Sequence, residues 1–428
     1  ITPCPWFTGV IAGRLQRADT RFLHNFPARF LILSETHVFL AFGPENSLMT
    51  PFDSADLPIF RLAPGQLTYS QLRASFLKAA HHRGAHLHAY PHPLKGVENE
   101  NLCTDVAVAG DPDAEKWIVV VSGTHGVEGY YGSICQTRFL LEQDVSPAAG
   151  VGILFIHLIN PWGTSWKRRV NEDNMDLNRN YLDFDQPLPA NPGYEAVHEL
   201  FATDIRDAAR RKARDLRWRQ TVEEKGYAAL MNIVEAGQYR HRDGLYYGGE
   251  KPSWSNLTLH KILKEHLPAH ARQVISFDLH TGAGQFGHPM LMAIAEQEYP
   301  GIARAQSIYG PWLYTVITGS NNASDTGISA AATGYTSAAM VKLFSDRQFI
   351  QLVVECGTYD SQSVGQPALL ADHFLHLHGD PSSAEGKKIK QRLLDFFFPA
   401  DPDWQALVQF RTRQILERAV RALRKNDQ

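Results

Sequence analysis

Two uninterrupted apolar runs constrain the fold of this chain more than any other feature. Residues 117–122 (WIVVVS) and residues 152–160 (GILFIHLIN) have the length of strands, and their lack of polar alternation indicates strands that are covered on both faces. Between them, residues 132–143 (GSICQTRFLLEQ) have the periodicity of a helix. A strand, a helix and a strand in this order predict a β-α-β unit, in which the two strands run parallel.

The same alternation continues along the chain. Apolar or alternating runs predict strands over residues 85–94, 274–280, 289–295, 312–317 and 351–357. Helical periodicity predicts helices over residues 69–84, 194–218, 254–267 and 403–425, the third of them capped by Ser255 or Asn256. Together these elements predict an α/β fold with a mostly parallel mixed central sheet and helices on both faces.

The size of the chain allows a single large domain. Its 428 residues are 44% hydrophobic and 20% charged, which is typical of a globular protein with a sizeable core. We find no internal repeat and no obvious linker, so we expect one domain over residues 66–428. Residues 1–65 are interpreted as an N-terminal extension of unknown role, with a native start near Met49.

Charge and cysteine content exclude several classes of function. A net charge of −3 gives no electrostatic reason to expect binding to nucleic acid or to an anionic membrane. No stretch reaches 18 uninterrupted apolar residues, so we expect no membrane span. The four cysteines are widely spaced and form no CxxC pair, which favours reduced thiols in a cytoplasmic protein.

Polar clusters stand where the apolar runs end. Residues 123–129, 278–284 and 355–359 each follow or close a predicted strand, and residues 168–181 lie in the loop after the strand 152–160. In an open α/β sheet, ligands bind outside the carboxyl ends of the strands. Clusters that are far apart in the sequence can therefore meet at one edge of the sheet.

Three of these polar residues form a set of metal ligands. His125, Glu128 and His280 supply two histidines and one carboxylate, the set that catalytic zinc sites use when they leave one position open for water. A single histidine at a strand end is more often structural, and HxxE alone is a short chance pattern. The prediction therefore depends on the combination, to which Glu355 adds a proton acceptor and two arginines add groups that bind anionic oxygen.

At this point the sequence resembles the zinc carboxypeptidase superfamily. The resemblance includes carboxypeptidase A and the aspartoacylase and succinylglutamate desuccinylase deacylases, and is closest to an uncharacterised bacterial carboxypeptidase-like branch. It runs from about residue 66 to the end of the chain. The segments that carry it are SGTHGVEGYYGS, INPWGTSWKRRVNEDNMDLNRNY, DGLYYGGEKPSWSNLTL, FDLHTGAG and VVECGTY.

The resemblance implies a zinc-carboxypeptidase-like (phosphorylase/hydrolase-like) fold, with residues 66–428 as the catalytic domain. It also implies one Zn²⁺ per chain, held by His125, Glu128 and His280. Asp176 matches a carboxylate that orients the first histidine. Glu355 matches the general base and acid, which would take the proton of a zinc-activated water and pass it to the leaving amine.

The same resemblance assigns the substrate-binding groups. Arg169 matches the arginine that polarises the scissile carbonyl, and Asn178 and Arg179 match the pair that grips a terminal carboxylate. No match to the family's substrate-closing tyrosine is evident, and Tyr335 and Tyr359 are both candidates. Residues 238–256 are characteristic of the uncharacterised branch and are either a lid over the site or a structural loop.

Other signals are weaker. The histidine-rich stretches 86–93 and 373–379 could each be interpreted as a metal site. Histidines at the surface or in packing contacts are the better interpretation of both stretches. Cys356 adjoins Glu355 and would therefore point to the opposite face of its strand, which argues against a catalytic thiol. No GxSxG, Walker or GxGxxG pattern is present in the sequence.

Three functional hypotheses follow. The leading one is a zinc-dependent hydrolase that cuts an amide bond next to a free carboxylate, as a metallocarboxypeptidase does. The second is a deacylase of N-acyl amino acids, as in the aspartoacylase and succinylglutamate desuccinylase relatives. The third is a non-catalytic binding protein, against which the presence of Glu355 with all three ligands argues. The expected partner is a small peptide or an N-acyl amino acid, and the sequence leaves the oligomeric state open.

Overall fold

The computed structural model describes residues 52–143, 150–318 and 332–424. Residues 1–51, which include Met49, lie outside the described residues. Within the described part, eight strands form one sheet in the order β1-β2-β4-β3-β5-β8-β6-β7. The strands are β1 (His86–Lys95), β2 (Asn101–Gly110), β3 (Lys116–Ser122), β4 (Gly152–His157), β5 (Gln273–Thr281), β6 (Pro289–Ala295), β7 (Leu313–Ile317) and β8 (Gln348–Cys356).

The centre of the sheet is parallel and its borders are mixed. β4, β3, β5 and β8 are neighbours and all run in the same direction. β2 pairs antiparallel with β1 and β4, and β6 pairs antiparallel with β8 and parallel with β7. The predicted α/β fold with a mostly parallel mixed sheet is confirmed, including the parallel pair of β3 and β4 around a helix. β2 was not predicted, because the buried polar residues Thr104 and Asp105 interrupt its apolar pattern.

Helices surround this sheet. Those of the described residues are α1 (Pro58–Arg61), α2 (Tyr69–His82), α3 (Gly129–Glu142), α4 (Pro161–Ser165), α5 (Pro192–Glu195), α6 (Glu199–Ala202), α7 (Ala208–Lys225), α8 (Tyr227–Glu235), α9 (Trp254–His266), α10 (Pro300–Tyr309), α11 (Thr336–Leu343), α12 (Gln366–His378), α13 (Ala384–Phe397) and α14 (Pro402–Arg424). No helix in the described ranges combines the length and the apolar character that a membrane crossing requires.

The single helix predicted over residues 194–218 is wrong. The segment forms α5, α6 and the first part of α7, and the Asp207 side chain accepts a hydrogen bond from the Arg210 backbone N–H to start α7. α6 buries Leu200 and Phe201, whereas α7 is almost entirely exposed, so the two helices cannot share one continuous face. The cap predicted for α9 is also wrong, because Ser253 accepts the bond from the Asn256 N–H.

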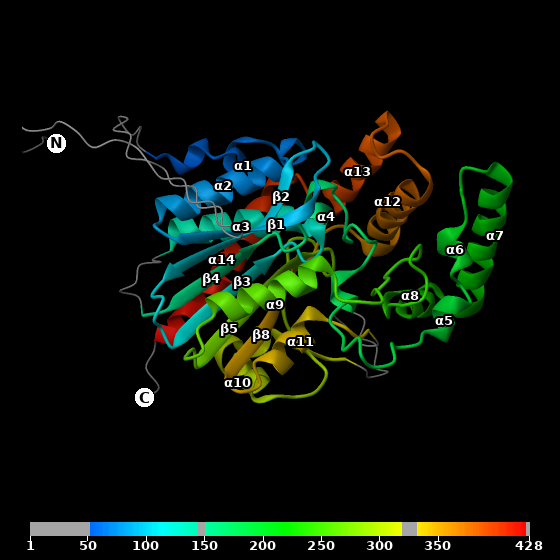
Figure 1. Ribbon diagram of the computed structural model, residues 1–428. Coiled ribbons are helices and arrows are strands. Elements are labelled where there is room, and N and C mark those ends of the chain that lie inside the picture. The colour runs from blue at the N-terminus through cyan, green and yellow to red at the C-terminus, as the bar shows by residue number, and fades with distance from the viewer. Residues whose placement is uncertain (1–51, 144–149, 319–331, 425–428) are drawn as a thin grey trace, which may run out of the picture. The chain divides into compact units, whose positions relative to one another are not determined.

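Side chains alternate between two cores on the two faces of the sheet. Ile118 and Val120 of β3 belong to the core that contains residues of α2, α3, α10 and α14. Trp117 and Val119 belong to the core that contains residues of α9 and α11. Figure 1 shows α9 and α11 on one side of the sheet and α2 and α3 on the other. Because both faces are covered, the strands read as the continuous apolar runs seen in the sequence.

The start of the described chain packs on the first of these cores. Leu57 and Ile59 precede the predicted boundary at residue 66, and both are buried in the core with α2 and α3. The compact unit that contains the sheet begins at Phe52. The division of the chain into an extension and a domain stays a prediction.

A smaller apolar cluster lies outside the sheet. α5, α6 and α8 bury Tyr194, Phe201 and Leu230 against one another, and Leu369 of α12 packs at their border. In Figure 1, α5 to α8 lie together beside the sheet, next to α12. The loop after α8 returns from this cluster, and its Tyr246 belongs both to the cluster and to the cavity described below.

A buried ionic cluster holds the loop that follows α4. Asp372 of α12 accepts a hydrogen bond from Arg168 Nε at 3.1 Å and forms an ion pair with Lys390 of α13. Burial opposes the charge of Asp372, but Lys390 and Arg168 together hold its pKa below the ordinary value. One carboxylate therefore ties the segment around Arg168 to two helices.

We predict that Asp372→Asn destabilises the fold, because it leaves two buried cations without their counterion. The expected loss is about 3–5 kcal/mol in the free energy of unfolding, measured by urea denaturation. Asp395→Asn removes an exposed carboxylate from α13 and should change this quantity by less than about 0.5 kcal/mol. Equal effects of the two substitutions would contradict the role of Asp372.

Candidate functional site

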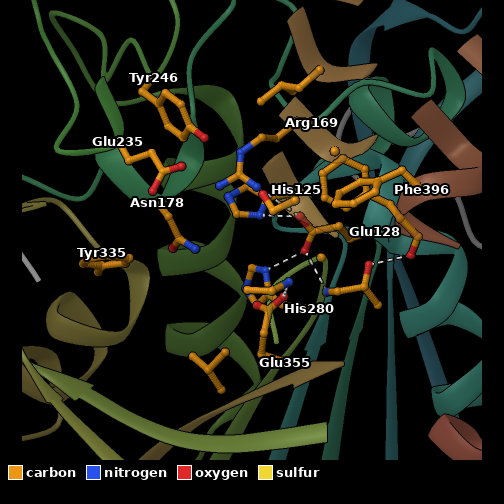
Figure 2. Close-up of a pocket in the computed structure, with 18 of the residues that line it drawn as sticks. His125, Glu128, Arg169, Asn178, Glu235, Tyr246, His280, Tyr335, Glu355 and Phe396 are labelled. Atoms are coloured by element: carbon orange, nitrogen blue, oxygen red, sulfur yellow. Dashed lines mark hydrogen bonds and ion pairs between the residues drawn. The ribbon is translucent and has the colours of Figure 1, made fainter. Parts of the chain in front are cut away.

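The polar clusters predicted at the strand ends meet in one cavity. β3, β5 and β8 are adjacent parallel strands, and the register pairs His280 with Glu355 across β5 and β8. His125 and Glu128 follow β3 directly, and Glu128 ends the 3-10 helix η3 (Gly126–Glu128) before α3. All four residues line the same cavity (Figure 2), as the topology of an open α/β sheet allows.

His125, Glu128 and His280 have the geometry of a metal site. His125 Nδ1 lies 2.8 Å from Glu128 Oε1, and His280 Nδ1 lies 2.8 Å from Glu128 Oε2. Each residue offers one potential ligand atom, and these three atoms all lie within 4.8 Å of one another. The imidazole centroids are 4.9 Å apart at an interplanar angle of 69°. Two Nδ1 atoms thus converge on one carboxylate, as ligands of a shared cation would.

Each of the two imidazoles has a second carboxylate behind it. His125 Nε2 lies 3.2 Å from Asp176 Oδ1, and the orienting role of Asp176 stays a prediction. His280 Nε2 lies 2.9 Å from Asp278 Oδ2, and the Thr124 hydroxyl donates to both oxygens of Asp278. A carboxylate that holds the second ring nitrogen fixes the ring orientation and raises the basicity of the ligand.

Burial and neighbouring charges act in opposite directions on these carboxylates. Desolvation alone would raise the pKa of Glu128, but His125 and His280 lower it well below the ordinary value. Burial likewise opposes the charge of Asp176, and Arg169 together with His125 holds its pKa far below the ordinary range. Both groups are therefore anionic at neutral pH, which suits a site for a cation.

Arg169 lies at the edge of the ligand set. Its Nε donates to Asp176 Oδ2 at 3.1 Å and its Nη1 donates to Glu128 Oε1 at 3.2 Å. The guanidinium is 17% exposed and lines the cavity. Arg169 therefore lies beside the candidate metal ligands, and its role at a reacting carbonyl stays a prediction.

Asn178 and Arg179 lie in the 3-10 helix η5 (Leu177–Arg179) on the same cavity wall. Arg179 Nε and Nη2 donate to the backbone carbonyl of Glu235, and Nη1 donates to that of Asn178. These bonds use three of the five N–H donors of a guanidinium and leave two for a ligand. The Asn178 Oδ1 atom accepts from the backbone and the hydroxyl of Thr336, so its amide NH₂ is turned to other partners.

Glu355 stands at the end of β8, where its Oε1 accepts a hydrogen bond from the Ala283 N–H at 2.9 Å. The side chain is buried and lines the cavity. Desolvation, together with the negative charge of Glu128, raises the pKa of Glu355 to about 7. A carboxyl group with this pKa can accept and return a proton near neutral pH. Cys356 contacts Tyr131 in the core, on the other face of the strand, as the alternation predicts.

One of the two candidate tyrosines lines the cavity. Tyr335 does, and its ring lies 4.9 Å from the Arg179 guanidinium carbon, whereas Tyr359 is 39% exposed and is not among the lining residues. Tyr246 lines the cavity as well, with the guanidinium carbons of Arg169 and Arg179 each 5.6 Å from its ring. Its φ of 51° lies in the left-handed region, which is strained for a bulky residue and frequent at functional sites.

Sequence reasoning did not assign Tyr246, Glu235 or Asp278 to the site. Tyr246 stands in the characteristic segment 238–256, whose aromatic residues were the available signal. Asp278 precedes His280 by two residues and therefore shares its strand face, which could have identified it. Glu235 ends α8, in a region without any recognisable motif.

Two further groups of histidines are weaker candidates for a metal site. His198, His241 and Asp243 could also approach a metal, but the two rings stack 3.7 Å apart and Asp243 is exposed. His373 Nε2 lies 3.0 Å from the carbonyl oxygen of Phe201, to which it donates, and His376 lies beside Trp162 and Trp166. These contacts agree with packing roles for the histidines of α12.

The residues present fit a zinc ion. Two imidazole nitrogens and one carboxylate oxygen are ligands that zinc accepts, and three protein ligands leave a further position for water or substrate. The cavity also contains a proton acceptor and two guanidinium groups. Such an arrangement is able to polarise a carbonyl group and to transfer a proton to or from water.

Comparison with solved structures finds distant similarity. Carboxypeptidase A of Helicoverpa armigera is 11% identical over 87% of this chain and 77% of its own, with a TM-score of 0.39. A metallo-carboxypeptidase of Burkholderia cenocepacia is 13% identical over 79% and 68%, with a TM-score of 0.35. A succinylglutamate desuccinylase of a Silicibacter species is 11% identical over 73% and 66%, with a TM-score of 0.34. At these scores the similarity carries no argument about the activity of this chain.

Sequence comparison gives a clearer result. No curated protein matches the chain. The pattern of the family described as "Protein of unknown function (DUF2817)" matches residues 66–411. This match confirms the predicted relation to an uncharacterised family and begins at the residue where the resemblance was expected to begin. Since the match spans most of the chain and includes every candidate site residue, the protein belongs to the DUF2817 family.

Proposed function

We propose that this protein is a zinc-dependent hydrolase that cleaves an amide bond next to a free carboxylate. The observation that carries the proposal is the convergence of His125, Glu128 and His280 within 4.8 Å, in a cavity that also contains Glu355. When bound by these three residues, a zinc ion would supply Lewis acidity, which lowers the pKa of a water molecule and polarises a carbonyl group.

Glu355 moves the proton in this proposal. As a carboxylate it accepts a proton from the attacking water, and as a carboxylic acid it returns that proton to the leaving amine. The buried position of Glu355 and its raised pKa make both forms accessible near neutral pH. Arg169, beside Glu128, stabilises the negative charge that develops on the carbonyl oxygen, and a donor of this kind contributes roughly 3–4 kcal/mol.

Arg179 and Asn178 hold the free carboxylate of the substrate. The two N–H donors that Arg179 has left match the two oxygens of a carboxylate, which explains an arginine better than a lysine. Its three bonds to backbone carbonyls fix the guanidinium in place before the substrate arrives. N-acyl amino acids also carry a free carboxylate, so a deacylase would use the same groups.

A substrate panel tests the function directly. We expect hydrolysis of N-acylated dipeptides or of N-acyl amino acids, and no hydrolysis of the same compounds with an amidated carboxyl terminus, because Arg179 then has no anion to bind. Product formation is measured by mass spectrometry. Glu355→Gln should lower kcat about 10²- to 10⁴-fold while the metal stays bound. Full activity of this variant would refute the assignment of Glu355 as the base. If the wild-type protein hydrolyses none of the compounds, the result favours a binding protein.

The metal is tested separately. We expect about one zinc per chain, lost in His280→Ala because the site then keeps only two of its three ligands. His270→Ala is the matched control, since it removes an exposed histidine that does not line the cavity, and it should retain the metal. Elemental analysis of the purified proteins gives the stoichiometry. Equal metal content in the two variants would contradict the assigned ligands.

The rate should depend on pH through Glu355. The base works only as a carboxylate, so kcat/KM should rise with pH up to the pKa of Glu355 and fall tenfold per unit below it. Burial and Glu128 raise this pKa to about 7, and a bound divalent cation would bring it below that value because positive charge favours the carboxylate. Initial rates with excess zinc test this, and a flat profile between about pH 4 and pH 8 would contradict the prediction.

A further inference from the structure

One carboxylate in the cavity has no part in the proposed reaction. Glu235 is the last residue of α8 and lines the cavity, where Figure 2 shows it beside Asn178 and Tyr246. The carboxyl end of a helix carries partial negative charge, so a carboxylate there is unfavourable for the helix. Stability of α8 therefore does not explain the presence of this residue.

The carboxylate of Glu235 has neutral partners. Gln366 Nε2 of α12 donates to its Oε1 at 3.0 Å, and the Tyr246 side chain interacts with it. Among the residues that the structure describes, no cation lies within ion-pair distance of this carboxylate. Burial raises its pKa, and the more distant Arg179 and Arg169 oppose that effect only in part.

Neither neighbouring arginine bonds to the carboxylate of Glu235. Arg169 forms ion pairs with Asp176 and Glu128. Arg179 binds the backbone carbonyl of Glu235 itself rather than its carboxylate. A half-buried anion without a counterion is costly, and a cation brought by a ligand would offset that cost.

Arg179, the group proposed to bind the substrate carboxylate, lies next to Glu235. Its guanidinium is bonded to the backbone of residue 235, so the group that grips a carboxylate and the group that attracts a cation are adjacent in the cavity. We propose that Glu235 recognises a positively charged nitrogen on the same substrate residue whose carboxylate is held by Asn178 and Arg179. This inference rests on the proposed function and names its substrate class.

The nitrogen is the side-chain ammonium of a basic residue whose α-nitrogen is in the scissile amide. This residue is either the C-terminal residue of a peptide or the amino acid of an Nα-acyl compound. Nα-benzoylglycyl-lysine and Nα-acetyl-lysine represent the two kinds of substrate. Nα-benzoylglycyl-norleucine has nearly the same shape as the first compound but no cation.

The test compares kcat/KM for the three compounds. In the wild-type protein at least one lysine compound should exceed the norleucine compound. Glu235→Gln keeps the size of the side chain and should lower kcat/KM for that lysine compound about 10- to 100-fold, with the norleucine compound unchanged within about twofold. Glu223→Gln removes an exposed carboxylate from α7 and should alter neither. Whichever lysine compound responds identifies whether the substrate is a peptide or an N-acyl amino acid.

Equal rates for lysine and norleucine in the wild type, or an equal loss for both in Glu235→Gln, would overturn the inference, since a structural role would affect both compounds. A binding measurement distinguishes a failure of this inference from a failure of the proposed function. In Glu355→Gln, calorimetry with free lysine and free norleucine requires no hydrolysis. Tighter binding of lysine that disappears in the double variant with Glu235→Gln supports the inference even if no compound is cleaved, and equal binding of the two amino acids overturns it.

Discussion

The burial of the Glu128 carboxylate is the constraint on which the site depends. This group lies inside the protein at the carboxyl end of the central strands, where an uncompensated charge would be very costly. Two imidazoles, the Arg169 guanidinium and the Thr281 backbone N–H all contact its oxygens. The same contacts place two Nδ1 atoms and a carboxylate around one point. The compensation that makes the fold tolerate Glu128 is therefore also the arrangement that a cation requires.

The rest of the cavity is built by elements that do not belong to the sheet. α8 and the loop after it bring Glu235 and Tyr246 into the cavity that contains the candidate metal ligands, and α12 brings Gln366. Arg179 connects the two parts, because it projects from the loop after β4 and binds the carbonyl at the end of α8. In the proposed function, the strand ends of the sheet supply the metal ligands and the proton acceptor, and α8 with the loop after it supplies groups that would select the substrate.

Much of the fold could be predicted because it follows from local periodicity. The runs 117–122 and 152–160 are apolar on both faces, a pattern typical of strands that are covered on both sides of a sheet. β2 escaped prediction because Asp105 is buried with Arg73 as its partner, a contact that links residues 32 positions apart. The breaks between α5, α6 and α7 also depend on tertiary packing, since each helix buries a different set of side chains.

The sequence by itself determined the chemistry that the site can contain. His125 and Glu128 are three residues apart after an apolar strand, and His280 and Glu355 close strands of the same type, so their convergence follows from parallel topology. Only the tertiary structure decided the charge balance of the cavity. Glu235 lies in no motif and reaches the site because α8 folds against α12, and the strained backbone of Tyr246 is visible only in three dimensions. The candidate metal ligands and Glu355 stand at strand ends, which a sequence reveals, whereas Glu235 reaches the cavity through packing between distant segments, which a sequence does not reveal.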